Sequence, residues 1–293
     1  MTQLPAHRRI TIISVSYNSM AVLPAMLASV PAGTPVVLVD NASLDPLAIA
    51  QCAARVNAVF IPQSENLGFG VACNAGAAQA VTEFIMFLNP DAQLQPDTLD
   101  QLIAGMDRYP KASAANPRIM NADGSAYFKR RSNLMPRAEY MPRGWPKADC
   151  EVTVLSGAAL MVRRQDFEAV GGFDPAIFLY HEDDDLSRRL RAERGPIMFI
   201  HGAVVRHLGG HSSVRSPQTA AFKAWHMGRS RVYAMRKHGR PMAFALALLD
   251  ALLQLCAPPV WFSRRKLAKQ RAFLRGVVSA IRPEPLPSRL RKP

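Results

Sequence analysis

The chain has 293 residues, of which 49% are hydrophobic, so it can bury a sizeable core and is not disordered throughout. Its four cysteines lack metal-type spacing, which argues against a structural zinc site and indicates thiols of a reducing compartment. The net charge of +14 belongs to the C-terminal part, because residues 206–293 hold 18 of the 36 Lys and Arg residues but only 2 of the 22 acidic ones. This asymmetry predicts an anionic partner, either nucleic acid or a membrane surface.

The first part of the chain alternates predicted strands with predicted helices. The β-branched run at 10–17 is too short for a secretion signal, and we predict it as the first strand. Further strands at 36–39, 58–62 and 83–88 are separated by helices at 23–30, 47–56 and 71–80. This rhythm is typical of a mostly parallel, doubly wound sheet, which binds ligands at the carboxyl ends of its strands.

The second part is less regular. We predict a helix at 96–109, strands at 112–120, 152–162 and 197–205, and a mobile loop over the site at 129–146, which is rich in proline and basic residues. Beyond residue 216 the composition changes to a basic helix at 222–238, an apolar stretch at 242–262 and a basic run to the end. The chain therefore divides into a predicted α/β domain at 1–215 and a helical, basic tail at 216–293.

Eight short polar or glycine-bearing stretches follow one another in a fixed order. They are Ile13-Ser-Val-Ser-Tyr-Asn-Ser19, Val39-Asp-Asn-Ala-Ser43, Glu65-Asn-Leu-Gly-Phe-Gly70 with Asn74, Phe87-Leu-Asn-Pro-Asp91, Ser156-Gly-Ala158, Gly171-Gly-Phe-Asp174, Glu182-Asp-x-Asp-Leu186 and His207-x-Gly-Gly-x-Ser212. As an ordered set, over about residues 10–213, they resemble the family 2 glycosyltransferases, in the bacterial branch that includes rhamnosyltransferases. The resemblance implies the GT-A fold, a Rossmann-like, mixed and mostly parallel sheet flanked by helices.

The same resemblance implies a binding site for a nucleotide sugar. It implies that the carboxylate of Asp40 accepts a hydrogen bond from the ring N–H of a uracil or thymine base. The sequence Asp-Asn-Ala-Ser is also typical of a turn, which is the structural alternative. The glycines at 68 and 70 would let the backbone approach the nucleotide, or would form only a tight connection. The implied donor-binding residues are Ser16, Asn18, Asp40, Asn41, Asn66, Gly68, Gly70, Asn74, Asn89, Asp91, Ser156 and Gly157.

A divalent cation, Mg²⁺ or Mn²⁺, is implied at the end of the strand before Asp91. The motif Asn89-Pro90-Asp91 carries one carboxylate where many relatives have two, so a second ligand is needed. His207 follows another apolar strand and matches a histidine that some relatives use, and His211 is the alternative. Such a cation would neutralise charge on the departing diphosphate.

The four consecutive acids Glu182 to Asp185 are the expected catalytic centre. Acids in the first turn of a helix oppose its macrodipole, which offers a purely structural explanation. Adjacent carboxylates raise one another's pKa, however, and an inverting sugar transfer needs a carboxylate that takes the proton of the acceptor hydroxyl. The family pattern points to Asp183 as this base, with Glu182 or Asp185 assisting.

The tail is expected to touch a membrane without crossing it. Residues 242–257 would rise about 24 Å as a helix, less than the roughly 30 Å of a hydrocarbon core. Asp250 and Gln254 form a narrow polar stripe, and a series of arginines and lysines follows. We predict peripheral docking on the anionic, cytoplasmic face of the bacterial membrane. The alternative is a helix that covers a homodimer interface; nucleic acid is disfavoured because no known binding module accompanies the charge.

The expected activity is the inverting transfer of a sugar from a dTDP- or UDP-sugar, with dTDP-rhamnose first by resemblance. The acceptor would be a cell-envelope glycan or a lipid-linked glycan. Two alternatives remain at this point. One is a sugar nucleotidyltransferase, and the other is a non-catalytic protein that binds a nucleotide sugar or glycan.

Overall fold

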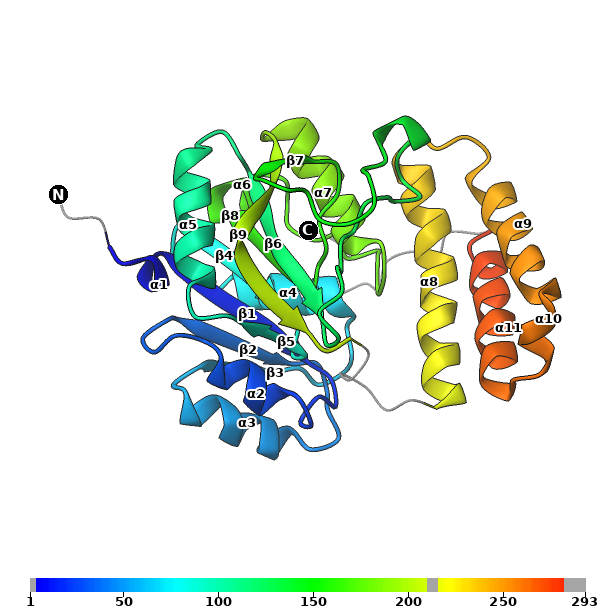
Figure 1. The fold of residues 1–293 in the computed structure, drawn as a ribbon. Coiled ribbons are helices and arrows are strands. Elements are labelled where there is room, and N and C mark those ends of the chain that lie inside the picture. Colours follow the sequence, from blue (N-terminus) through cyan, green and yellow to red (C-terminus); the bar gives the residue numbers. More distant parts are fainter. Residues whose placement is uncertain (1–3, 210–215, 282–293) are drawn as a thin grey trace.

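A computed structural model describes residues 4–209 and 216–281. Within them, nine strands form one mixed sheet in the order β3-β2-β1-β4-β8-β6-β9-β5, and β7 pairs with β9. Helices cover both faces of the sheet, and the C-terminal helices stand beside it as a separate group (Figure 1). The strands are β1 Ile10–Ser16, β2 Val36–Asp40, β3 Val59–Pro62, β4 Phe84–Leu88, β5 Ala92–Leu94, β6 Ala114–Asn121, β7 Cys150–Val152, β8 Ala159–Arg163 and β9 Ile197–His207.

The first half of the sheet is parallel, as predicted. Strands β1, β2, β3 and β4 pair in parallel, and β1 shows why they are buried on both faces. Ile10 and Ile12 pack in one core cluster, whereas Ile13 and Val15 pack in the other. The helices α2 Leu23–Ala28, α3 Pro46–Arg55 and α5 Thr98–Arg108 contribute to the first cluster, and α4 Phe69–Ala77, α6 Arg164–Ala169 and α7 Glu182–Glu193 or their flanks contribute to the second. The short helix α1 Ala6–Arg9 precedes β1.

The second half of the sheet is largely antiparallel, and one prediction is wrong there. The single strand expected at 152–162 is two strands, because β7 pairs with β9 whereas β8 pairs with β4 and β6. The turn between them carries Ser156, whose backbone N–H and C=O both bond the side chain of Asn116. The short strand β5 was not predicted. It pairs with β9 so that Ala92 lies opposite His207.

The expected loop at 129–146 is anchored to the sheet. Leu134 and Met135 are buried, and the indole N–H of Trp145 donates to the carbonyl of Ile119. A short 3-10 helix, η1 Arg137–Glu139, lies in its middle. Only its first residues reach the site described below.

The C-terminal helices are α8 Pro217–Lys237, α9 Ala243–Cys256, α10 Pro258–Trp261 and α11 Arg264–Ser279. Helices α8 and α11 touch backbone to backbone at two glycines: a Cβ on Gly228 would meet the carbonyl of Phe273, and one on Gly276 would meet the carbonyl of Trp225. In the described part of the chain, no helix is both long enough and apolar enough to cross a bilayer.

Candidate active site

A pocket of about 750 Å³ opens at the carboxyl ends of β1 and β4. The turn at 156–158 and the segment 126–131 form two of its walls, and the first turn of α7 forms another. Helix α8 closes it with Thr219, Phe222, Lys223 and Met227. The pocket therefore draws its walls from both of the units that the sequence suggested, and the expected boundary at 215/216 lies at the edge of the undescribed residues 210–215.

Asp91 and His207 lie side by side because of the register between β5 and β9. Ala92 is paired with His207, and the N–H of Leu208 donates to the carbonyl of Asp91 at 2.9 Å. The result is a distance of 3.3 Å between His207 Nε2 and Asp91 Oδ1, with both side chains buried. His211, the alternative ligand, lies outside the described residues.

This pair fits a divalent cation in spacing and donor chemistry. Two ligands that bind a cation at about 2.1 Å and at right angles lie about 3 Å apart. The Nδ1 atom of His207 is also buried without a hydrogen bond among the described residues. Within those residues, no group of three or more His, Cys, Asp or Glu side chains converges, so a cation here would need oxygen atoms from a bound substrate.

Of the four acids, Asp183 is held toward the pocket by three donors. Its Oδ2 accepts the backbone N–H of Gly157 at 2.9 Å and lies 2.7 Å from Lys129 Nζ, while its Oδ1 accepts the N–H of Asp184 at 2.9 Å. The preceding residues Tyr180 and His181 both have positive φ values, 66° and 71°. Such strained conformations gather at functional sites, and here they turn the chain into α7.

Lys129 is the site residue that the sequence did not single out. It bridges Asp183 and Asp184, the second at 2.9 Å, and the hydrogen bond between His181 Nδ1 and Asp184 Oδ2 completes the cluster. Burial disfavours the charged form of Asp184, but Lys129 and His181 outweigh this effect and hold the pKa of Asp184 well below its usual range. Burial also disfavours the charge of Lys129, but Asp183 and Asp184 outweigh burial and raise the pKa of Lys129 above its ordinary value. The signal that could have found it was the run of basic residues at the start of the 129–146 loop.

Glu182 is the acid with a raised pKa. It is buried at the pocket wall, its Oε2 makes no hydrogen bond among the described residues, and burial and the nearby charge of Asp183 raise its pKa to about 8. At neutral pH this side chain is mostly protonated. It can therefore donate a hydrogen bond to a substrate oxygen, and it cannot serve as the base in that form.

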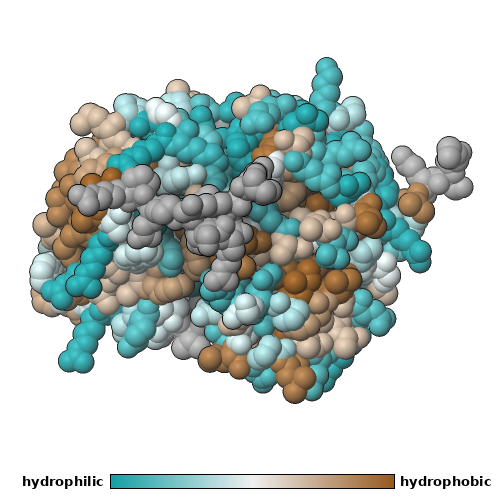
Figure 2. Space-filling view, turned by 180° about the vertical axis from the view of Figure 1, so that it is seen from behind, coloured by the Kyte–Doolittle hydropathy of each residue, from teal (hydrophilic) through white to brown (hydrophobic). Residues whose placement is uncertain are grey.

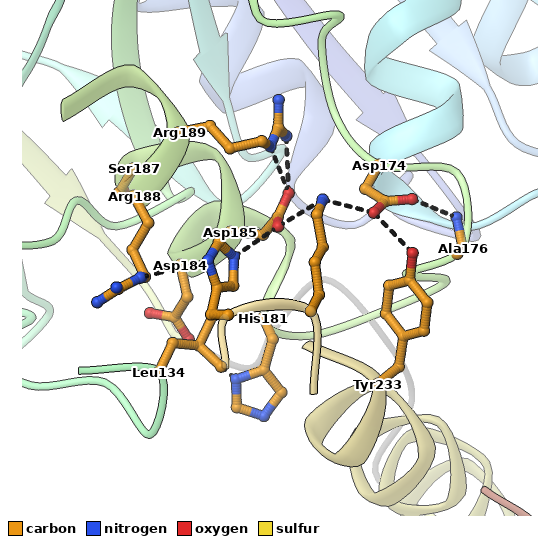
Figure 3. A network of polar contacts seen from close by, with 12 residues as sticks. Leu134, Asp174, Ala176, His181, Asp184, Asp185, Ser187, Arg188, Arg189 and Tyr233 are labelled. Atoms are coloured by element: carbon orange, nitrogen blue, oxygen red, sulfur yellow. Dashed lines mark hydrogen bonds and ion pairs between the residues drawn. The ribbon is translucent and has the colours of Figure 1, made fainter. Parts of the chain in front are cut away.

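Asp185 is not in the pocket, which corrects its expected place beside the chemistry. Its carboxylate is fully buried and contacts Arg189 at 2.7 Å, Lys237 at 2.7 Å and His238 at 2.8 Å. Burial opposes its charge, but the bond from His238 and the charge of Arg189 lower the pKa of Asp185 to about 2. Figure 3 shows Asp185 turned toward Arg189, and Lys237 bridges Asp185 to Asp174, which accepts the hydroxyl of Tyr233. Asp185 thus joins α7 to the end of α8.

The residues expected around the nucleotide base form a connected edge of the sheet. Ser16, Asp40 and Pro62 align across β1, β2 and β3, and the first two are buried. Asp40 accepts the N–H of Ser43, and Asn18 braces the same turn by accepting the N–H of Leu44 at 2.8 Å. Of this group, the pocket wall includes only the neighbouring Asn41.

The asparagine and glycine residues of the 65–74 stretch serve mainly to hold loops. Asn41 donates to Asn66 at 2.9 Å, and both line the pocket. A Cβ on Gly68, at φ +87°, would strike the carbonyl of Phe178, and one on Gly70 would press on Phe173. Asn74 bonds Phe173 through both N–H and carbonyl oxygen. Gly68 and Gly70 thus approach the 173–178 segment closely, and Gly68 also lines the pocket, so their approach to a nucleotide stays a prediction.

The remaining expected residues lie at the floor of the pocket. Asn89, Ser156 and Gly157 all line it, and the N–H of Asn89 donates to the carbonyl of Ala158 at 3.0 Å. Because the N–H of Gly157 also donates to Asp183, the pocket floor and the Asp183 carboxylate are fixed to one another.

Helix α8 is attached to the pocket by an aromatic stack and a cation. The ring of His226 stacks on Phe178 at 3.9 Å, and burial, with the charge of Arg229, lowers the pKa of His226 to about 4. Burial lowers the pKa of Lys223, and the negative charge of Asp91 opposes this shift. Lys223 also lines the pocket.

Comparison with known proteins gives one consistent result. Residues 11–171 match the model of glycosyl transferase family 2. The chain is 31% identical over 268 residues to an N-acetylglucosaminyl-diphospho-decaprenol L-rhamnosyltransferase of Mycobacterium tuberculosis, covering 78% of this chain and 84% of the relative.

Solved structures agree on the fold. A mannosyltransferase from Pyrobaculum calidifontis in complex with GDP-Man and Mn²⁺ superposes with a TM-score of 0.57 at 16% identity, covering 93% of this chain and 87% of the other. S. aureus TarS 1-349 in complex with UDP-GlcNAc gives a TM-score of 0.57 at 17% identity, with 92% and 91% covered. The expected GT-A architecture is confirmed.

Proposed function

The chain belongs to glycosyl transferase family 2, and on this premise we propose that it is an inverting transferase of rhamnose from dTDP-rhamnose to a lipid-linked glycan. The donor class rests on the family, and the choice of sugar and of acceptor rests on the 31% identical relative. A UDP-sugar is the other donor to be tested. The observation that carries the proposal is the orientation of Asp183 at the pocket wall.

In the proposed reaction, Asp183 accepts the proton of the acceptor hydroxyl. The hydroxyl oxygen forms a bond to the anomeric carbon of the sugar as the bond from that carbon to the nucleoside diphosphate breaks on the opposite face. The N–H of Gly157 and the ammonium of Lys129 hold the carboxylate in place. Glu182, protonated at neutral pH, can donate a hydrogen bond to a hydroxyl group in the same pocket.

We further propose that Asp91 and His207 bind Mg²⁺ or Mn²⁺. When bound, the cation neutralises negative charge on the departing diphosphate. Lys223, which feels the charge of Asp91, would add a positive charge on the same side. Asp40 and Asn41 would contact the nucleobase of the donor, at the edge of the sheet where Asn18 accepts a hydrogen bond from the turn after β2.

A lipid-linked acceptor would place the enzyme at the inner face of the cytoplasmic membrane. This location is part of the proposal. The alternative is that the exposed face of the tail is covered by a second copy of the chain in a homodimer.

The direct test offers dTDP-rhamnose with Mn²⁺ or Mg²⁺ and a polyprenyl-diphosphate N-acetylglucosamine acceptor. We expect release of dTDP and a product heavier by one deoxyhexose, and a loss of turnover of about 10²–10⁴ in Asp183→Asn. Release of pyrophosphate from dTTP and a sugar 1-phosphate, with no transfer from dTDP-rhamnose, would favour a nucleotidyltransferase instead. Donor binding with no product from any donor would favour a non-catalytic protein.

A further inference from the structure

Helix α9 buries three alanines and exposes four leucines, while Phe244 and Leu248 pack partly buried against the other C-terminal helices. Ala243, Ala247 and Ala251 are buried against the other C-terminal helices. Leu246, Leu249, Leu252 and Leu253 are 43%, 54%, 44% and 63% exposed. A helix of a water-facing domain normally shows the reverse arrangement.

The polar stripe of α9 explains why its leucines point outward. Asp250 forms an ion pair with Arg231 of α8, and Gln254 donates to Asp250 at 2.8 Å. These polar groups are thus satisfied against α8. The polar stripe predicted from the sequence therefore contacts α8, with Asp250 still 37% exposed, and the exposed leucines lie on the outer face of the helix.

The exposed apolar surface continues beyond α9. Trp261 and Phe262 are 56% and 90% exposed at the end of α10. Figure 2 shows this apolar surface gathered over the C-terminal helices, at the end of the molecule that Figure 1 shows on the right. Contiguous exposed apolar surface of this kind marks an interaction site.

Basic side chains border the apolar surface without any acidic residue among them. Residues 251–281 contain no Asp or Glu, and the exposed cations at the start and along the outer side of α11 are Arg264, Arg265, Lys266, Lys269, Arg271 and Arg275. Exposed Trp and Phe beside Arg and Lys are typical of helices that lie in a membrane interface.

We propose that the outer face of α9 together with Trp261, Phe262 and the start of α11 is a docking surface for an anionic lipid bilayer. The leucines and aromatic rings enter the headgroup and upper acyl region, and the arginines and lysines contact the anionic headgroups. Charge selects this occupant over a second copy of the chain, because two copies of a face bordered by six cations would repel one another.

This inference deepens the proposed function and rests on its lipid-linked acceptor. Helix α8 packs against α9 and α11 and at the same time lines the pocket with Phe222 and Lys223. Docking would therefore hold the pocket close to the bilayer in which such an acceptor is anchored. The donor site itself needs no membrane.

The test is co-sedimentation of the full-length protein with vesicles of phosphatidylcholine containing phosphatidylglycerol, and with vesicles of phosphatidylcholine alone. We expect binding to the anionic vesicles that weakens as salt is raised. Leu249→Glu/Leu253→Glu should lower the partition coefficient by at least about a hundredfold. Arg264→Gln/Arg265→Gln/Lys266→Gln should lower it by roughly a hundredfold for anionic vesicles only, since each basic residue contributes about fivefold.

Leu47→Glu/Val81→Glu is the matched control, because these residues are 68% and 87% exposed and lie far from the tail in the sequence. It should bind as the wild type does. A melting curve for each variant excludes misfolding, and transfer to an acceptor with a short, water-soluble tail should survive in Leu249→Glu/Leu253→Glu. If the wild type transfers no sugar to this acceptor, the proposed function is wrong. The vesicle measurement would still decide whether the surface binds a membrane.

Two outcomes would overturn the docking proposal. One is unchanged vesicle binding by Leu249→Glu/Leu253→Glu. The other is a wild-type protein that ignores vesicles but is dimeric in light scattering, with the same double variant monomeric, which would assign the surface to a second copy of the chain.

Discussion

Lys129 Nζ lies 2.7 Å from Asp183 Oδ2, so the proposed base is held by a cation from the 129–146 loop. The same ammonium reaches Asp184, whose side chain is 6% exposed. Removing it would leave two close carboxylates without this ammonium, although the hydrogen bond between His181 Nδ1 and Asp184 would remain. The cluster is therefore the first place where the site can be tested.

Lys129→Met should destabilise the fold by a few kcal/mol and reduce turnover, because it strands buried carboxylates. The pKa of Asp184 should rise toward its ordinary range, since the charge of Lys129 helps to hold it down. Urea unfolding and donor turnover measure the two effects. Arg143→Met, an exposed change in the same loop, should leave both as they are, and equal losses in the two variants would contradict the role given to Lys129.

Asp183→Asn and Asp185→Asn should fail in different ways. Asp183 faces the pocket, so its amide should keep most of the stability while turnover falls. Asp185 neutralises Arg189, Lys237 and His238, so its amide should cost about 3–5 kcal/mol of unfolding free energy. Denaturant midpoints and single-turnover rates measured at a saturating donor concentration separate the two. An Asp185→Asn variant that is as stable as the wild type but inactive would instead indicate that Asp185 takes part in the reaction.

Glu182 should make the fold less stable as pH rises from about 5 to 8. Its pKa of about 8 in the folded protein exceeds the ordinary glutamate value of 4.5, so in this window the native state binds more protons than the unfolded chain. Glu182→Gln mimics the neutral acid and should remove about 2–4 kcal/mol of this decline. Unfolding curves at three pH values for both proteins provide the measurement, with Glu193→Gln at the exposed end of α7 as the control.

Asp91→Asn and His207→Ala should each weaken the thermal stabilisation given by Mn²⁺ with dTDP, by 10-fold or more in apparent cation affinity. Without the cation, their melting temperatures should stay near that of wild type. His201→Ala, on the same strand β9, provides a comparison outside the cation site. Undiminished cation stabilisation in both site variants would show that the cation binds elsewhere.

The parallel half of the sheet could be predicted because each strand there is a short apolar run closed by turn residues. Its register also follows, since the polar residues Ser16 and Asp40 come to one edge together. Asp183 lines the pocket because it lies in the first turn of α7, and its role as the base stays a prediction.

Contacts made across long stretches of sequence could not be predicted. Strand β5 has three residues, Ala92–Leu94, too few for an alternating pattern to be visible. Asp185 and its partners Lys237 and His238 are joined only because α8 returns to α7. Nothing in the composition of the 129–146 loop distinguished Lys129 from its basic neighbours.

The pairing of Ala92 with His207 also bears on how the protein folds. Asp91 and His207 come from distant parts of the sequence, and closing so long a loop is slow relative to local helix formation. We therefore expect the cation site to form only when β9 joins the sheet, after most of the helices are in place. The time at which the protein begins to bind the cation during refolding would then show when β9 joins the sheet.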